Sequence, residues 1–392
     1  MSISKMKVIY FGSLSSSDSD FPLLREFQRQ GLDVVAYFLL ADWNKRKGMI
    51  YSDFVFHKDF ICKASEVEAF KVYSSYINLD RIFVINSYHY KRYHWQSWLL
   101  WIKTLIHMYR QHASLIHFVW PPVKQEKLLY FLRMKKVLTV HDPFPHSSGQ
   151  TKFNEMNRIE AFKRCDRFVL LNDSMRDDFI AKYKIPGEKI LQNKMGEVDI
   201  MKEHPLLRDG DAHEINTILY FGQIQSHKGI EYLLEAMTLI HDKYPNIRLV
   251  VAGKGKFYFD IKPYESLDYI EFRNRYIPVP ELSTILGESL FVVCPYIDAT
   301  QSGVVQTAFS ANVPLIVTSV GNMPEEVKNG EYGLVVPPKD PLALSEAMEK
   351  LLDNPNMLER FRKNIDEKWR PTMSWEPIAN KYINMYRELA SE

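Results

Sequence analysis

The chain starts with a run of hydrophobic residues at 7–13 (KVIYFGS), followed by a helical hydrophobic period over 21–31 and a second hydrophobic run at 32–40. Uninterrupted hydrophobic runs of this length that end in Gly or Ser are typical of strands buried on both faces of a parallel sheet. The pattern therefore predicts a strand–helix–strand unit. Comparable strand-like runs recur through the first half of the chain, at 81–86, 114–120, 135–142 and 167–172.

Residues 200–215 interrupt this alternation, because they are charged, contain Pro and Gly, and show no helical or strand period. We interpret them as a linker. A second alternating series follows, with strand-like and helical segments at 217–222, 229–244, 247–253, 269–277, 280–289, 290–296, 303–311, 313–320 and 341–353. Two successive α/β series of similar length predict two doubly wound Rossmann-like domains that face each other across a cleft. In such sheets ligands bind at the carboxyl ends of the strands.

Composition agrees with two domains and excludes some partners. A chain of 392 residues exceeds the size that one hydrophobic core usually reaches. The net charge of +2 gives no general attraction to nucleic acid, so no nucleic-acid partner is expected. The three cysteines, Cys62, Cys165 and Cys294, have neither metal-ligand nor CxxC spacing, as is typical of a reducing compartment.

The targeting features of the sequence indicate a cytoplasmic protein. The first residues, MSISKMKVIYFGS, lack the long apolar segment of a secretory signal. No stretch holds the roughly eighteen uncharged apolar residues of a membrane-spanning helix, since the nearest candidate, 95–109, is interrupted by Lys103 and His107. We therefore expect the protein in the cytoplasm or on the inner face of a membrane.

The loop at 220–230 (YFGQIQSHKGI) places Gly222 at the end of a strand and Lys228 just before a helix. Its spacing differs from that of a P-loop, which disfavours a nucleoside triphosphatase. A lysine at a helix N-terminus is unfavourable beside the positive end of the helix dipole unless an anion lies between them. The alternative interpretation is a solvated surface lysine.

A second loop, DATQSG at 298–303, separates a buried strand from a helix of small residues and has Asp298 as its only charged residue. Free amide groups at a helix start, with a glycine that allows close approach, can bind an anion without a charged side chain. A simple serine cap is the alternative. A third glycine loop, VAGKGK at 251–256, also follows a strand. Together the three loops favour a ligand that carries phosphate.

From these motifs onward the chain resembles a known family. The segments ILYFGQIQSHKGIEYLLEAM, IRLVVAGKG and LFVVCPYIDATQSGVVQTAFSANVPLIVTSVGNMPEEVKNGEYGLVVPP resemble, in order and spacing, the donor domain of a retaining glycosyltransferase of the GT-B fold, family 4 (glycosyl transferases group 1). The resemblance covers roughly residues 165–392. The first half is similar more loosely, through KVIYFGS and KVLTVHDP.

The resemblance implies an activity and a division of labour. The expected reaction transfers a sugar from a nucleotide-diphosphate sugar to a glycan or lipid-linked acceptor, with retention of configuration, in polysaccharide or glycolipid biosynthesis. Residues 1–200 would form the acceptor-side domain, 201–371 the donor domain, and 372–392 a helix that crosses back to the first domain. The donor loops lack a DxD-type motif, so neither a metal nor a cofactor is expected.

The resemblance also implies roles for individual residues. Lys228 would bind the diphosphate and the amide groups from Ser302 onward the distal phosphate. His141 would lie beside the donor sugar in a positioning or polarising role; the alternative is an HDP turn that only closes a strand. The donor-binding residues implied in full are Gly12, Gln223, Lys228, Gly253, Asp298, Gln301, Ser302, Gly303, Val304 and Thr307.

Three positions depart from the family pattern. Gln223 replaces an arginine, while Ala299 and Thr307 replace the two glutamates that bind sugar and ribose. Asp298 could substitute for the first glutamate. Thr307 could bond a ribose hydroxyl, or its hydroxyl could be satisfied by the preceding turn of its helix. These departures keep a non-catalytic nucleotide-sugar-binding relative or partner protein as the alternative function; a nucleotide-sugar epimerase would need more acid–base residues.

The first domain has an unusual basic and aromatic segment. Residues 81–125 contain no Asp or Glu, but they include Lys and Arg residues and four tryptophans, at 95, 98, 101 and 120. A basic, Trp-rich helix suits an anionic membrane interface, so residues 91–112 are a candidate peripheral membrane contact. The alternative is a core helix whose few charged side chains point outward.

Overall fold

The computed structural model describes residues 6–41, 60–87, 94–141, 143–144, 152–171, 175–200, 216–299 and 303–392. The chain forms two compact units, which are described separately. Unit 1 comprises Met1–Gly196 and Ser374–Glu392, and unit 2 comprises Glu197–Met373. Of residues 200–215, which we interpret as a linker, all but Ile200 lie outside the described part.

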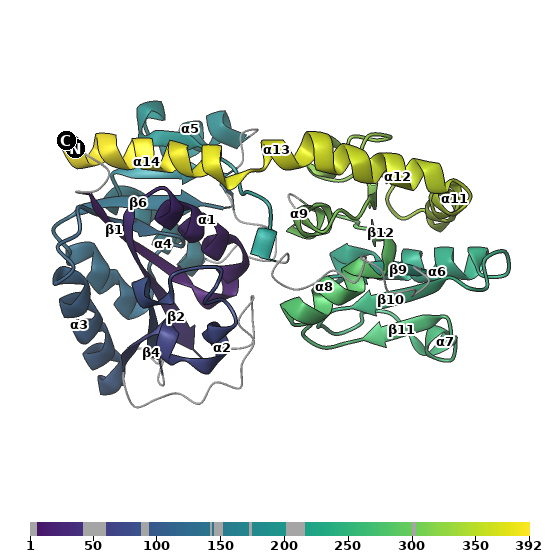
Figure 1. Ribbon diagram of the computed structural model, residues 1–392, viewed down its shortest axis with the longest axis horizontal. Helices are drawn as coiled ribbons and strands as arrows, with labels where there is room; N and C mark the ends of the chain where they lie inside the picture. The colour runs from purple at the N-terminus through teal and green to yellow at the C-terminus, as the bar shows by residue number, and fades with distance from the viewer. Residues whose placement is uncertain are drawn as a thin grey trace. The chain divides into compact units, whose positions relative to one another are not determined.

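Unit 1 is built on an eight-stranded sheet of order β3-β4-β2-β1-β5-β6-β7-β8 (Figure 1). All neighbouring strands are parallel except β3, which runs antiparallel to β4. The strands are β1 (Lys7–Ser13), β2 (Asp33–Ala41), β3 (Ile61–Lys63), β4 (Ile82–Ser87), β5 (Leu115–Phe118), β6 (Lys135–Val140), β7 (Arg167–Leu170) and β8 (Ile190–Gln192). The chain order reverses between β1 and β5, so their carboxyl ends form the expected ligand crevice of this unit.

The helices of unit 1 cover both faces of its sheet. They are α1 (Ser17–Arg29), α2 (Glu68–Lys71), α3 (Trp95–Tyr109), α4 (Lys152–Arg164), α5 (Arg176–Tyr183) and α14 (Trp375–Ser391). One face of the sheet, with Phe11 and Phe118, packs with Trp101 of α3 and Phe179 of α5 in one core. On the other face α14 packs against α1, where the rings of Tyr382 and Tyr386 contact Phe27.

Unit 2 contains a six-stranded sheet of order β11-β10-β9-β12-β13-β14 in which every pair is parallel (Figure 1). Its strands are β9 (Thr217–Phe221), β10 (Arg248–Ala252), β11 (Ile270–Arg273), β12 (Ser289–Cys294), β13 (Leu315–Thr318) and β14 (Gly333–Val336). Because β10 and β12 flank β9 on opposite sides, the strand order reverses at β9. The carboxyl ends of β9 and β12 are therefore where a ligand crevice is expected.

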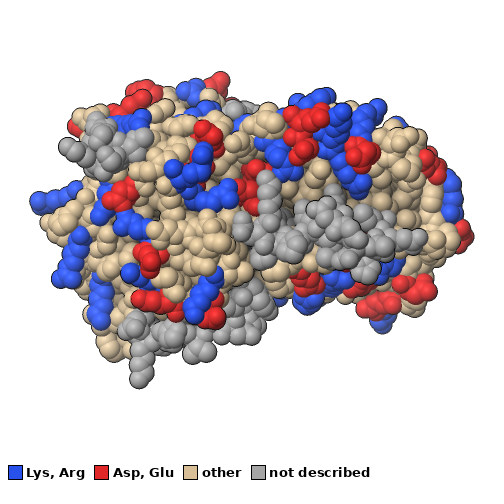
Figure 2. All heavy atoms as spheres, viewed as in Figure 1, with Lys and Arg blue, Asp and Glu red and all other residues tan. Residues whose placement is uncertain are grey.

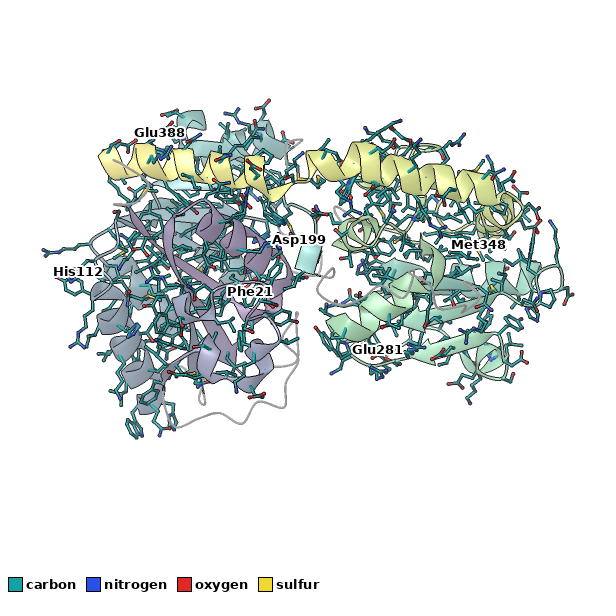
Figure 3. All side chains as sticks on the ribbon, viewed as in Figure 1. Phe21, His112, Asp199, Glu281, Met348 and Glu388 are labelled. Carbon is teal, nitrogen blue, oxygen red and sulfur yellow. The ribbon has the colours of Figure 1, made fainter. Side chains whose placement is uncertain are left out.

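The helices of unit 2 alternate with its strands. They are α6 (Ile230–Ile240), α7 (Lys262–Glu265), α8 (Val279–Gly287), α9 (Gly303–Ser310), α10 (Met323–Val327), α11 (Pro341–Leu352), α12 (Pro355–Asn364) and α13 (Arg370–Thr372). Apolar side chains such as Met348 of α11 are fully buried, and Figure 3 shows how densely side chains fill both units.

The prediction of two doubly wound α/β domains is confirmed. Some element bounds differ from the hydrophobic pattern. The first helix begins at Ser17, four residues before the predicted start, because Asp18 and Asp20 in its first turn favour the positive helix end. The predicted strand at 269–277 ends at Arg273, after which the chain leaves the sheet.

Candidate functional site

Three glycine loops meet at the carboxyl edge of the unit 2 sheet. A Cβ atom built on Gly253 would lie 1.6 Å from the carbonyl oxygen of Gly222, so the loops after β9 and β10 are in backbone contact. A Cβ on Gly222, whose φ is +135°, would lie 3.6 Å from Cγ2 of Val304 at the start of α9. The structure therefore brings Gly222 together with Gly253 and Val304, two of the residues that the sequence implied for donor binding.

The loop that carries Lys228 is held against the loop after β12. Gly229 adopts a φ of +62°, and a Cβ there would lie 2.1 Å from the carbonyl oxygen of Pro295. The Ile297 N–H donates to the carbonyl oxygen of His227 at 2.8 Å. A side chain at position 229 would separate the two loops, which explains why glycine follows the lysine.

Lys228 is half-buried, in contrast to a solvated surface lysine. Its Nζ lies 3.7 Å from the centroid of the Tyr296 ring, in cation–π geometry. Burial lowers the pKa of Lys228, and the neighbouring Cys294 thiol counteracts this only partly. Within the part of the chain that the structure describes, no carboxylate forms an ion pair with it. A bound oxyanion would provide the missing counter-charge.

The start of α6 is partly occupied by the chain itself, while our expectation of an anion between Lys228 and this helix end stays a prediction. The Tyr258 hydroxyl accepts a hydrogen bond from the Ile230 N–H at 3.2 Å and itself contacts the Glu231 carboxylate. Sequence reasoning missed Tyr258, because it lies 28 residues from Ile230. The start of α9 is thus the better candidate for phosphate binding.

At the start of α9, Gly303 has open space on its Cβ side, so a ligand can approach the backbone closely. Gln301 and Ser302 lie outside the described residues. The Thr307 hydroxyl donates to the carbonyl oxygen of Gly303 at 2.8 Å, so its proton is used within the helix and only its lone pairs remain for a ribose. Asp298 is exposed beside this loop.

Gln223, which replaces the family arginine, is exposed next to Gly222. Its side-chain oxygen accepts a hydrogen bond from Gln225 Nε2 at 2.9 Å, and its backbone oxygen accepts one from the Tyr220 hydroxyl at 2.8 Å. The backbone at this position is therefore fixed, while the side chain supplies no positive charge.

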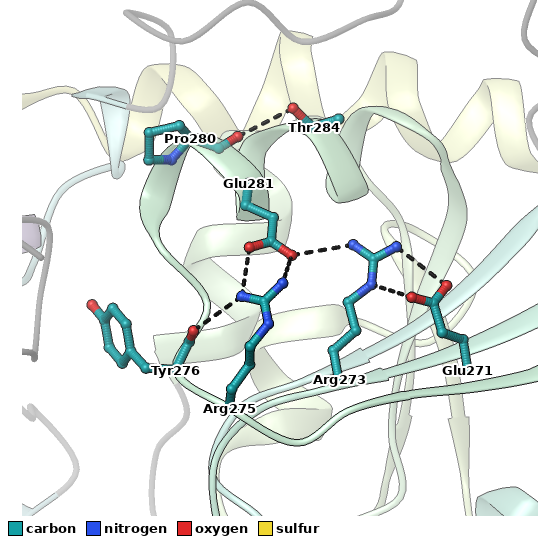
Figure 4. A network of polar contacts seen from close by, with 7 residues as sticks. All are labelled: Glu271, Arg273, Arg275, Tyr276, Pro280, Glu281 and Thr284. Carbon is teal, nitrogen blue, oxygen red and sulfur yellow. Dashed lines mark hydrogen bonds and ion pairs between the residues drawn. The ribbon is translucent and has the colours of Figure 1, made fainter. Parts of the chain in front are cut away.

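A network of ion pairs supports the edge of the site next to Gly253 (Figure 4). Arg273 bonds Glu271 and also Glu281 of α8, while Arg275 forms a bidentate pair with Glu281 at 2.6 and 2.7 Å. The carbonyl oxygen of Arg273 accepts from the Gly253 N–H at 3.1 Å. The network therefore fixes the strand end against which the Gly253 loop rests. The sequence pattern did not reveal it.

In unit 1, His141 follows β6 and stacks on the Trp120 ring, with centroids 4.2 Å apart and the planes inclined by 13°. A small pocket lies beside it and is lined by residues that include Asp20, Thr139, Lys194 and Tyr382. His141 thus lies in the ligand crevice of this unit, as its place after β6 predicts. Its assigned role with the donor sugar stays a prediction.

Asp20 is a buried carboxyl group in this pocket that sequence reasoning missed. Its two oxygens accept hydrogen bonds from the Tyr10 and Ser16 hydroxyls, each at 2.7 Å. Burial raises the pKa of Asp20 to about 7, although these two hydrogen bonds counteract the shift. Gly12, placed by the sequence among the donor-binding residues, lies in β1 of unit 1, where a Cβ would be 3.2 Å from Asp20 Oδ2.

His117 of β5 connects this pocket to α14. One ring nitrogen contacts the Tyr386 hydroxyl and the other lies 2.7 Å from Thr139 Oγ1. Burial, with a smaller effect of His141, lowers the pKa of His117 to about 3, so the ring is neutral at ordinary pH. The C-terminal helix is thereby bonded to the centre of the unit 1 sheet.

Two general properties bear on possible ligands. Across the described ranges, no three His, Cys, Asp or Glu side chains are grouped as metal ligands would be. In the same ranges, no helix has the length and apolar character needed to cross a bilayer.

Residues 215–354, which include all three glycine loops, match the family model of Glycosyl transferases group 1. This part of the chain is therefore similar to that family. An uncharacterised glycosyltransferase of Methanocaldococcus jannaschii is 26% identical over 70% of this chain and 74% of its own length. The alpha-D-kanosaminyltransferase of Streptomyces kanamyceticus is 23% identical over 58% of this chain and 62% of its own, so the alignment spans less than two thirds of that relative.

Solved structures show that the chain has the GT-B fold. Sucrose-phosphate synthase from Thermosynechococcus elongatus aligns with a TM-score of 0.68 and 16% identity over 98% of this chain and 99% of its own. Anabaena HepE in complex with UDP and glucose aligns with a TM-score of 0.67 and 13% identity over 98% and 100%. UDP-GlcNAc 2-epimerase from Neisseria meningitidis, bound to UDP-GlcNAc, aligns with a TM-score of 0.62 and 12% identity over 97% and 100%.

Proposed function

We propose that the protein is a glycosyltransferase that moves a sugar from a nucleoside-diphosphate sugar to a glycan or lipid-linked acceptor, with retention of configuration, in polysaccharide or glycolipid biosynthesis. The observation that carries the proposal is Lys228, a half-buried cation in one of the three glycine loops. Because its described surroundings contain no carboxylate partner, a diphosphate fits the site. The match to the group 1 family model and the nucleotide complexes of solved proteins with this fold support the same ligand.

The chemistry follows from where negative charge develops. When the bond between sugar and phosphate breaks, charge grows on the bridging oxygen of the nucleoside diphosphate. Lys228 would stabilise that oxygen, and the backbone amides at the start of α9 would bind the distal phosphate. This arrangement requires neither a metal nor a protein nucleophile. His141 would act in unit 1 by positioning or polarising the substrate.

The departures from the family pattern favour a second candidate, a relative that binds a nucleotide sugar without turning it over. Ala299 and Thr307 provide no carboxylates for sugar and ribose, and the Thr307 proton is already donated within α9. Asp298, exposed in the loop after β12, is the acidic side chain that could replace the first glutamate.

A panel of UDP-, GDP-, ADP- and dTDP-sugars, with release of nucleoside diphosphate as the readout, separates these functions. The transferase predicts release from at least one donor, increased by a suitable acceptor. Tight binding of one donor that remains intact identifies the non-catalytic relative. Recovery of an isomerised sugar nucleotide, without transfer, identifies an epimerase.

Replacing Lys228 with alanine tests the diphosphate assignment. We expect donor affinity or turnover to fall by about 100-fold, since loss of a partly buried charge-assisted contact costs about 3 kcal/mol. Lys350→Ala, which removes an exposed lysine of α11, is the matched control and should leave both unchanged. Unchanged kinetics and affinity in Lys228→Ala would refute the assignment.

A further inference from the structure

Helix α3 of unit 1 is apolar on two opposite sides. Its inner side, with Leu100, Trp101 and Met108, belongs to the core. Its outer side carries large exposed hydrophobic side chains at intervals of three or four residues, which places them in one stripe. They are Trp95, Trp98, Ile102, Ile106 and Tyr109. The stripe extends about 21 Å along the helix.

The exposure of this stripe distinguishes between the two interpretations of the segment. Trp95 and Tyr109, at its two ends, are 65% and 63% exposed, and Ile102 and Ile106 between them are both 46% exposed. A core helix with outward-pointing charges would present Lys and Arg on this side instead. Five large apolar side chains in contact with water are unfavourable for an isolated protein, which indicates that a partner covers them.

The Asp, Glu, Lys and Arg side chains of α3 and its C-cap residue are all positively charged. Lys103 and Arg110 are exposed beside the stripe, and Figure 2 shows Lys and Arg side chains at the left edge of the view, where Figure 1 places α3. Residues 81–125 contain no acidic side chain. In the neighbouring 3-10 helix η5 (Lys124–Phe131), the buried Glu126 accepts a hydrogen bond from the Val123 N–H at 2.9 Å and is directed inward.

We propose that the outer face of α3 docks onto the surface of an anionic lipid bilayer. Trp and Tyr at both ends suit the level of the lipid head groups, and the isoleucines between them suit the acyl boundary. Lys103 and Arg110 complement anionic lipids. A second copy of the same face fits less well, because it would bring two helices together that carry positive charges and no acidic side chain. The binding does not depend on the proposed transferase activity, so the two can fail independently.

Sedimentation of the whole protein with vesicles tests the proposal. We expect co-sedimentation with vesicles that contain phosphatidylglycerol, much weaker binding to pure phosphatidylcholine, and release at high salt. The triple variant Trp95→Ser/Trp98→Ser/Ile102→Ser should reduce the bound fraction at least tenfold. The double variant Leu239→Ser/Leu342→Ser, which removes exposed apolar side chains of unit 2, is the matched control and should bind normally.

A second measurement distinguishes loss of membrane contact from misfolding of the triple variant. Trp95→Phe/Trp98→Phe keeps the stripe apolar, so it should still bind, but the blue shift of tryptophan fluorescence on adding vesicles should be lost. Absence of binding to anionic vesicles at low salt would overturn the proposal. So would binding that the triple variant leaves unchanged, or a lipid-free dimer that the triple variant dissociates.

Discussion

At Lys228 and Asp20 the protein keeps ionisable groups in surroundings that oppose their charge. Burial lowers the pKa of the lysine and raises that of the carboxyl group to about 7. Ionisable groups with perturbed pKa values are concentrated at functional sites, where a bound ligand can compensate for the unfavourable surroundings. Each lies at the carboxyl end of the strands in its own unit. Lys228 and Asp20 therefore indicate one ligand-binding region in each unit.

The Asp20 carboxyl group should make stability depend on pH. Its pKa rises from an ordinary 3.8 to about 7 in the folded protein, so the folded state binds a proton that the unfolded state has lost. The favourable contribution of this proton to the free energy of unfolding is complete below pH 4 and is lost as the pH rises through 7. Asp20→Asn should therefore gain stability relative to the wild type over this range, by up to about 4 kcal/mol. Urea unfolding at several pH values measures the difference in the free energy of unfolding between the two proteins. Hydrogen exchange in β1 then shows whether the difference arises in unit 1.

His117 provides the control of opposite sign. Its pKa falls from 6.5 to about 3, so its contribution is complete above pH 6.5 and is lost as the pH decreases. His117→Gln should therefore be less stable than the wild type by a smaller free energy of unfolding at pH 4 than at pH 7.

For the Asp20 prediction, a difference in stability between wild type and Asp20→Asn that does not change with pH would show that the carboxyl group titrates normally.

The sequence predicts the positions of the glycine loops better than it predicts the side chains that hold these loops in place. Gly222 and Gly253 each end a hydrophobic run and Gly303 ends the loop after another, so the rule for parallel sheets places them at one edge. The side chains that hold the loops depend on contacts between distant segments. Tyr258 contacts the start of α6, and Glu281 of α8 contacts the end of β11. No local pattern encodes such pairs.

For α3, the sequence predicts a helix but not which side faces water. Both sides carry large apolar side chains, so the hydrophobic pattern alone does not say which of them faces the core. Packing of Trp101 against Phe11 settles the orientation and leaves Trp95 and Tyr109 outside. The interpretation as a core helix with outward charges therefore describes only its inner face.

Gly253→Ala tests whether the loops need backbone contact. The added methyl group would overlap the carbonyl oxygen of Gly222, so the loop must move, and we expect unit 2 to lose about 2–4 kcal/mol of stability. Gly303→Ala is the control, since its methyl group meets open space, and its effect on stability should stay within about 0.5 kcal/mol. Thermal unfolding compares the two; equal stabilities would contradict the close contact.

Across the whole molecule, the division into two units does not follow chain order. Unit 1 contains residues from both ends of the chain, and unit 2 is one continuous insert between them. Hydrophobic periodicity predicted both sheets, because strand runs are local features. It could not assign the last helix, since the contacts of Tyr382 and Tyr386 with His117 and Phe27 join distant parts of the chain.

Removing residues 374–392 should therefore damage the unit that contains the first residues. Without α14, the His117 ring loses its Tyr386 partner and Phe27 loses its aromatic neighbours. We expect hydrogen exchange to accelerate by orders of magnitude in β1 and β5, while β9 and β12 stay protected. Tyr386→Phe, which keeps the ring, should give a much smaller effect. Normal protection of β1 in the truncated protein would contradict this view of the unit.

The position of α14 also has a consequence for synthesis on the ribosome. The strands of unit 1 leave the ribosome first, but the helix that covers one face of their sheet emerges only after residues 197–373. At usual translation rates this delay is on the order of ten seconds or more. During that time the face of the unit 1 sheet that carries Tyr10 and His117 is not covered by α14. The nascent chain thus has a long-lived apolar surface, on which general chaperones can act before the last helix closes it.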